Sequence, residues 1–337
     1  MENYVEIKVQ TMMKNGNLDA IRFNKLLTTT YNKDSIEYCF DFNRFNDCKP
    51  FTILLVAESI LQFKSKHQTA KFSAKMDNMK SFSYLCHMGF FQYIGISVGK
   101  SPNESHNSKS CFPIKTISFD EMSLEEAYKE IEHHADQLAL IVENNIKSDL
   151  FEVMKYSIIE MVRNSIEHSE KCQVSICGQR RNDLNTVEFA IFDRGIGIEK
   201  SMKSLRKVSN PPAGYNFLEY SLFPGISALS NIKLLDKGNS YINSGYGLFY
   251  TSEICKQFEG GFILISYNDA ILVSSKNKLD KFKCYYEGTG VQVRIKTDIT
   301  KSLKNIIKEI NTNILPKYKN AGLVKNKPSR SSGGLKP

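Results

Sequence analysis

Three polar residues share one side of an expected helix near the middle of the chain. Glu160, Asn164 and His168 recur every four residues, so a helix brings a carboxylate, an amide and an imidazole to the same face. The opposite face would pack on a sheet, because it carries an apolar stripe formed by Leu150, Val153, Met154, Ile158, Met161, Val162 and Ile166. This combination suggests metal-nucleotide chemistry.

A glycine turn follows two strands later. The run VEFAIF predicts a buried strand, and it leads directly into Asp193, Gly195 and Gly197 in the segment DRGIGI. Asp-x-Gly-x-Gly alone is common, since many strands end in glycine turns. It becomes informative because Glu160-x-x-x-Asn164 lies one helix and two strands upstream.

A second glycine pair opens another expected helix. Gly245 precedes the segment GLFYTSEICKQF, which begins with Gly247, and glycines at a helix start let backbone N–H groups approach phosphates. The strand GGFILISYN follows, and then a second strand over residues 288–295, which contains Thr289.

Taken in order, these four segments resemble the sequence boxes of the GHKL superfamily, the ATP-binding domains of gyrase, Hsp90, histidine kinases and MutL. The resemblance covers about residues 145–296. It implies a Bergerat-type α/β sandwich, with a mixed sheet covered by helices on one face. The overall fold class that we expect is α/β (α+β).

The resemblance implies how the base of ATP would be held. Asp193 would accept a hydrogen bond from the adenine amino group, and Thr289 would support that contact. Gly195 and Gly197 would let the chain pass close to the base and the sugar.

It also implies how the phosphates would be held. Asn164 would bind Mg²⁺ through its side-chain oxygen, while Gly245 and Gly247 would cradle the phosphates. Glu160 would act as general base on a water molecule or a substrate hydroxyl. His168 receives no task.

Glu160 limits which GHKL subfamilies, and therefore which reactions, the chain resembles. Histidine kinases usually lack this carboxylate, whereas ATPases of the gyrase type and the serine kinases that regulate sigma factors carry it. The ATPases normally have a further domain, for which about forty residues after the last box are too few, and RNSIEHS is closer to the anti-sigma-factor kinases. We therefore expect an ATP–Mg²⁺-binding regulatory protein that hydrolyses ATP or phosphorylates a protein serine or threonine. A non-catalytic nucleotide sensor, whose lid closure controls partner binding, stays open as the alternative. A histidine kinase is a second alternative, although the helix with HHADQLAL lacks the acceptor signature.

The first part of the chain, residues 1–115, alternates expected strands and helices. SIEYCFDFNRF alternates as a strand with Ile36, Tyr38, Phe40 and Phe42 on one face, and Pro50 opens the helix FTILLVAESILQFKSK. This order, with a later YLCHMGFF segment, resembles the STAS-like domains of anti-sigma-factor antagonists. It implies a binding module for a protein partner.

The remaining segments complete the expected domain map. We expect a connecting helix in residues 116–148, the ATP-binding domain in 149–297 with a lid at 199–244, an amphipathic helix at 298–318, and a disordered basic tail at 319–337.

The charge distribution and the cysteines bear on the partners and the location of the protein. The net charge is +9, but ten basic against two acidic residues from Lys296 onward account for +8 of it, so nucleic acid is a disfavoured partner. Scattered cysteines without metal spacing and a start without an apolar signal region favour the cytoplasm. No segment is predicted to span a membrane, and a homodimer stays open.

Overall fold

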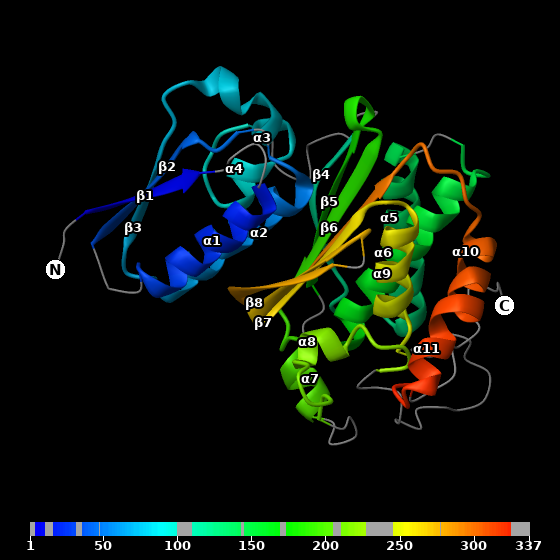
Figure 1. Ribbon diagram of the computed structural model, residues 1–337. Helices are drawn as coiled ribbons and strands as arrows, with labels where there is room; N and C mark the ends of the chain where they lie inside the picture. The colour runs from blue at the N-terminus through cyan, green and yellow to red at the C-terminus, as the bar shows by residue number, and fades with distance from the viewer. Residues whose placement is uncertain are drawn as a thin grey trace.

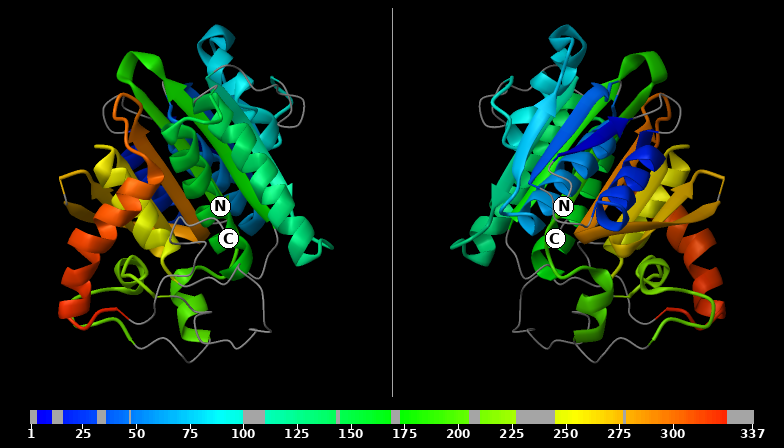
Figure 2. Two further views of the ribbon diagram at one scale, coloured as in Figure 1. Left: turned by 90° about the vertical axis from the view of Figure 1, so that its right-hand side faces the viewer. Right: turned by 90° about the vertical axis from the view of Figure 1, so that its left-hand side faces the viewer.

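The protein forms four stacked layers: a small sheet, two helices, a large sheet and an outer helical layer (Figure 1). This computed structural model describes residues 4–10, 16–31, 36–46, 48–99, 110–142, 145–168, 173–204, 210–226, 245–276 and 278–324. The two outer faces of the stack, the helical one and the small sheet, are seen in the two views of Figure 2. Mixed α/β architecture is thereby confirmed.

The small sheet is parallel throughout, with strand order β1 (Val5–Gln10), β2 (Glu37–Arg44) and β3 (Lys71–Lys75). The crossovers α1 (Gly16–Thr29) and α2 (Pro50–Lys66) lie on the same face, as right-handed connections between neighbouring strands require. Tyr38, Phe40 and Phe42 are buried under them as expected, whereas Ile36 precedes β2 and is 53% exposed. The short helices η1 (Met79–Phe82), α3 (Ser83–His87) and α4 (Phe90–Tyr93) complete this part.

The large sheet has the order β4 (Cys111–Ser118), β5 (Gln173–Arg181), β6 (Thr186–Asp193), β8 (Leu279–Lys296), β7 (Gly261–Ser274). Every neighbouring pair is antiparallel, so the expectation of a mixed sheet is wrong. Two tight connections, the turn η2 (Asn182–Leu184) and the β7–β8 hairpin, impose antiparallel pairing. The expected boundary at residue 115 falls within β4, which pairs with β5 and therefore belongs to the large sheet.

The outer layer consists of α5 (Leu124–Val142), α6 (Asp149–His168) and α9 (Gly247–Gln257). α5 is packed on α6 and β5 and shares their core, so it is part of this domain and not a connector. The apolar stripe of α6 faces the sheet as expected, with Val153, Met154 and Ile158 almost fully buried.

The C-terminal helix begins later than expected and is not broken by proline. Ser302 caps α10 (Leu303–Glu309), whose chain continues through the π-helical turn Ile310–Ile314 into α11 (Leu315–Asn320). Pro316 lies in the first turn of α11, where its missing N–H group costs little. Residues 325–337 of the expected tail lie outside the described part of the chain.

The second face of the large sheet is covered by the N-terminal helices, so the expectation of helices on one face only is wrong. α2 is apolar on all sides, and twelve of its seventeen residues are buried. One core therefore joins it to both sheets, and Phe51 contacts Phe192 of β6 with 5.5 Å between ring centroids. Among the described residues, no helix combines the length and apolarity needed to cross a membrane.

Candidate functional site

The polar side of α6 meets the start of α9. Gly247 is the first residue of α9, and a Cβ atom placed there would lie 2.4 Å from Oε2 of Glu160 and 3.3 Å from Nδ2 of Asn164. Any larger residue would push these side chains aside. The structure thus brings together Glu160, Asn164 and Gly247, which the sequence separates by more than eighty positions.

Asp193 ends β6 and is only 3% exposed. Its Oδ1 accepts a hydrogen bond of 2.9 Å from the backbone N–H of Gly195. The Ser165 hydroxyl, which donates to the carbonyl of Met161 at 3.3 Å, and the backbone N–H of Thr289 also lie close to the carboxyl group and favour its charged form. Thr289 is the residue opposite Asp193 in the β6–β8 ladder, which explains why these two expected site residues are neighbours.

Burial raises the pKa of Asp193 from 3.8 to about 6, although Gly195, Ser165 and Thr289 each favour the charged form. A carboxyl group with such a pKa gains or loses its proton near neutral pH. It is also a strong acceptor when ionised, because little water competes for it.

The turn after Asp193 is held by the β7–β8 hairpin. Gly197 has φ +72°, and a Cβ atom there would lie 2.4 Å from the Tyr267 ring. Oγ of Ser266 accepts from the N–H of Ile198 at 2.9 Å and donates to the carbonyl of Gly288 at 2.9 Å. The glycine is therefore required by the close approach of the hairpin.

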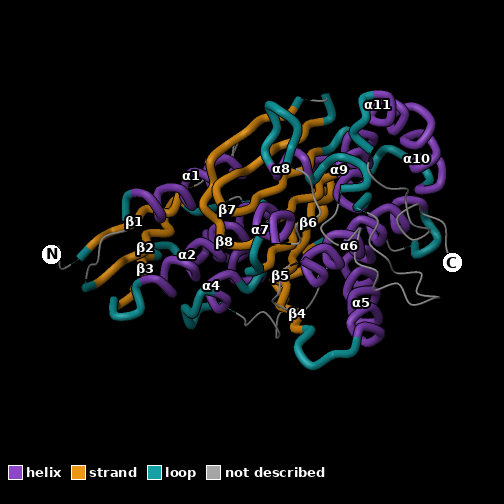
Figure 3. Tube along the Cα trace, turned by 90° about the horizontal axis from the view of Figure 1, so that it is seen from below, coloured by secondary structure: helices purple, strands orange, loops and turns teal. Residues whose placement is uncertain are grey.

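The expected lid is described in part. α7 (Ile198–Ser204) and α8 (Phe217–Tyr220) lie beside the end of the large sheet, as Figure 3 shows from below. Gly245 has φ +77°, and its carbonyl accepts a 3.1 Å bond from the N–H of Gly225. Residues 205–209 and 227–244 of the lid lie outside the described residues, as does the side chain of His168.

Helix α6 links the two halves of the site. Asn164 faces Gly247 of α9, and the next residue, Ser165, lies beside Asp193 of β6. Six of the eight expected site residues therefore fall into two groups. Asp193, Gly195 and Thr289 form one, and Glu160, Asn164 and Gly247 form the other. Gly197 packs against Tyr267, and Gly245 packs against Gly225 and Ile226.

Sequence reasoning missed several supporting residues. Nη1 of Arg163 lies 3.3 Å from Oε1 of Glu160, both side chains are 5% exposed, and the guanidinium stands 5.5 Å from the Tyr128 ring centroid. The Tyr286 hydroxyl donates to the carbonyl of Asp193 at 2.7 Å. Phe282, Cys284 and Tyr286 alternate as in a strand, which indicates that β8 begins well before residue 288 and includes this tyrosine.

A divalent cation would depend on few protein ligands. Within the described residues, no group of three His, Cys, Asp or Glu could hold a metal ion. The amide of Asn164 is half-buried, and its Nδ2 atom is the one that faces Gly247. Its side-chain oxygen would be the ligand of a Mg²⁺ ion that takes most of its oxygen ligands from phosphates and water.

No protein-family model matches the chain, and no curated protein matches its sequence. The assignment of function therefore depends on the geometry of the site.

Proposed function

We propose that the chain binds ATP with Mg²⁺ in a GHKL-type site between α6, the β6–α7 turn, the start of α9 and β8. One observation carries the proposal: the four segments that resemble the GHKL boxes meet in two pairs joined by α6. Asp193 lies opposite Thr289, Gly247 packs against Glu160 and Asn164, and Ser165 of the same helix lies beside Asp193.

Each residue then has a role that its position supports. Asp193 accepts from the adenine amino group, with Thr289 beside it and Gly195 next to the base and sugar, whereas Gly197 gives its space to the Tyr267 ring. At the other end, Gly245 and Gly247 lie at the N-terminus of α9, where backbone N–H groups and the helix dipole favour phosphates, and Asn164 offers an amide oxygen to Mg²⁺. When bound, the ion would neutralise phosphate charge.

In the leading form of the proposal, the protein is a regulatory enzyme. A water oxygen or a protein serine or threonine hydroxyl attacks the γ-phosphorus, the bond to the bridging oxygen breaks, and ADP leaves. Glu160 takes the proton from the attacking hydroxyl. The STAS-like N-terminal module and a cytoplasmic location belong to the same proposal.

A second candidate, a nucleotide sensor without turnover, is favoured by the surroundings of Glu160. The carboxylate is 4% exposed and packed between Gly247 and Arg163. A water molecule reaches it only if the first turn of α9 moves. In this case nucleotide binding changes the lid and the partner-binding surface, and Glu160 holds the site together. The histidine-kinase alternative has less support, because His134 on α5 is bonded to Glu130 at 2.9 Å.

Binding is tested with a fluorescent ATP analogue and magnesium. Asp193→Asn should weaken binding about tenfold to a hundredfold, the loss of a hydrogen bond to a charged group. Asp183→Asn is the matched control, because Asp183 is exposed on the η2 turn and paired with Arg181. Asn164→Ala should remove the magnesium dependence. Wild-type protein that fails to bind ATP, or an Asp193→Asn variant that binds as tightly as wild type, would refute the proposal.

The two reactions are separated with γ-labelled ATP, alone and with cell lysate. Label on inorganic phosphate or on another protein, lost in Glu160→Gln while binding persists, supports the enzyme. Binding without any transfer of label supports the sensor.

A further inference from the structure

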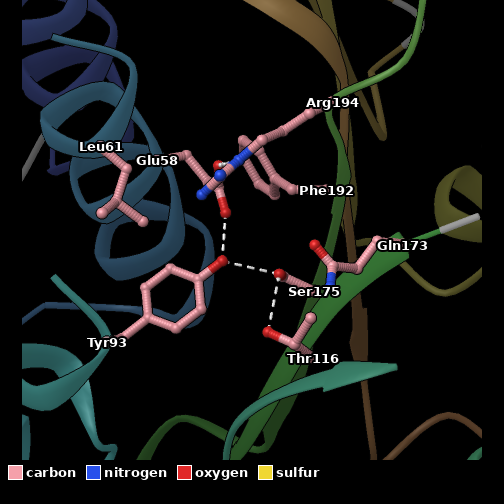
Figure 4. Close-up of a pocket in the computed structure, with 8 residues that line it drawn as sticks. All are labelled: Glu58, Leu61, Tyr93, Thr116, Gln173, Ser175, Phe192 and Arg194. Carbon is pink, nitrogen blue, oxygen red and sulfur yellow. Dashed lines mark hydrogen bonds and ion pairs between the residues drawn. The ribbon is translucent and has the colours of Figure 1, made fainter. Parts of the chain in front are cut away.

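Arg194 connects the glycine turn to the N-terminal module. Side chains alternate at the end of β6, so Asp193 faces α6 while Arg194 points to the opposite face of the large sheet (Figure 4). There its Nε donates to Oε2 of Glu58 at 2.7 Å. Glu58 lies in the middle of α2 and is 1% exposed.

The same carboxylate is held from a second direction. The Tyr93 hydroxyl of α4 is hydrogen-bonded to Oε1 of Glu58 and lies 2.7 Å from Oγ of Ser175 on β5. Oγ of Ser175 is in turn 3.3 Å from the hydroxyl of Thr116 on β4. Burial and the neighbouring Glu58 raise the pKa of Tyr93 above its ordinary value, so this hydroxyl keeps its proton at working pH.

The buried side chain of Glu58 needs a partner, and Arg194 is one. A buried carboxylate is unstable unless it is paired and hydrogen-bonded. Burial alone lowers the pKa of Arg194, but the attraction of Glu58 and its hydrogen bond raise it above the ordinary value. Arg194 therefore keeps its charge beside Glu58, and the contact fixes a residue that stands between Asp193 and Gly195 in the chain.

The pair borders a cavity of about 460 Å³ between the two modules. Leu61 and Phe192 give it apolar walls, and the polar side chain of Gln173 also lines it (Figure 4). The side chain of Arg194 is 42% exposed there, whereas that of Glu58 is 2% exposed. One partner of the pair is thus partly exposed and the other is buried. The contact can be broken by substituting either residue, which gives two independent variants.

We propose that the Glu58–Arg194 pair is a positioning device, by which the N-terminal module holds the turn from Asp193 to Gly197 in the shape that binds nucleotide. Neither residue touches the nucleotide. The inference rests on the proposed ATP site, and it makes the N-terminal module part of that site's architecture.

The control is another buried carboxylate between the same two modules. Oε1 of Glu188 on β6 accepts from the N–H of Phe51 at 3.1 Å, at the first turn of α2 and five residues before Asp193. Glu188→Gln should lower the melting temperature, yet it leaves the turn untouched.

The first readout needs no nucleotide. In hydrogen exchange, Glu58→Gln and Arg194→Gln should each speed exchange of the Gly195 and Ile198 amides about tenfold or more, the effect of losing one charged hydrogen bond. These amides are bonded within the turn and to Ser266. Glu188→Gln should leave their exchange unchanged relative to global opening.

The second readout is the affinity for the fluorescent ATP analogue. Each single variant of the pair should raise the Kd about tenfold. The double variant should raise it no more than either single variant, because each substitution already breaks the same interaction. Glu188→Gln should keep Kd within about twofold. If Glu58→Gln and Glu188→Gln behave alike, or if neither variant of the pair changes exchange, the positioning role is wrong. If wild type binds no ATP while exchange responds as expected, the proposed function fails and the anchoring of the turn stands.

Discussion

The raised pKa of Asp193 makes the stability of the protein depend on pH in a defined way. The folded carboxyl group has a pKa of about 6, against 3.8 ordinarily. Below pH 3.8 the carboxyl group is protonated in both the folded and the unfolded chain, so it does not lower the free energy of unfolding. Between the two values the unfolded chain ionises while the folded one keeps its proton, so stability falls as pH rises. Above pH 6 both are ionised and the loss is complete.

The magnitude follows from the same two values. A difference of about 2.2 pH units, at about 1.36 kcal/mol each, gives a loss of about 3 kcal/mol between roughly pH 4 and pH 7. Other carboxylates titrate in this range too. The quantity to measure is therefore the difference between Asp193→Asn and wild type, since the amide cannot titrate.

Urea denaturation at a series of pH values provides that difference. The free energy of unfolding of Asp193→Asn, minus that of wild type, should rise with pH by about 3 kcal/mol and level off above about pH 6.5. Saturating ATP and magnesium should flatten the rise, because the adenine amino group favours the charged carboxylate. A difference that stays constant from about pH 4 to pH 7 would show that the folded pKa of Asp193 is not raised.

Three further predictions test the packing of the site and of the module interface. Gly247→Ala should cost about 1–3 kcal/mol of stability, because the added Cβ atom clashes with Glu160. Adding Glu160→Ala should recover about 1 kcal/mol of this loss. If urea denaturation shows that the effects of the two substitutions simply add, the contact is contradicted. Gly288→Ala places a Cβ atom 2.0 Å from the Asp193 carbonyl at φ +136° and should cost about 3 kcal/mol of stability or more. Gly214→Ala is the control, because Gly214 has φ +88° but no atom within 4 Å of the added Cβ. It should cost about 1–2 kcal/mol in the same assay. Asn24→Ala removes the acceptor of the Tyr285 N–H at 2.6 Å and should cost about 2 kcal/mol, with faster exchange of that amide as the specific sign.

Periodicity predicted most of the elements and the contacts within one segment. The apolar stripe of α6 and the alternation of Tyr38, Phe40 and Phe42 were confirmed, because each depends only on the local repeat of helix or strand. The neighbourhood of Asp193 and Thr289 followed from the order of the boxes and is realised by the β6–β8 register.

Contacts between distant segments were beyond the sequence. Arg194 occupied a variable position in Asp-x-Gly-x-Gly, and its partner lies 136 residues earlier. In the sequence, Glu58 is a single carboxylate within the apolar segment FTILLVAESILQFKSK. No repeat or spacing relates the two, since the pair exists because one helix is sandwiched between two sheets.

That sandwiching decides how the two modules can influence each other. A helix on a surface can shift while its sheet stays in place, but α2 fills the space between two sheets and has no solvent face of useful size. Its first turn is bonded to Glu188, its middle to Arg194, and Gln62 near its end pairs with the backbone of Glu287 through both N–H and C=O. A displacement of α2 therefore strains three points along the large sheet, and only the middle one belongs to the turn beside Asp193. A protein partner that moves the N-terminal module would act on the nucleotide site through that point, and nucleotide that orders the turn would act back on the module with the same free energy.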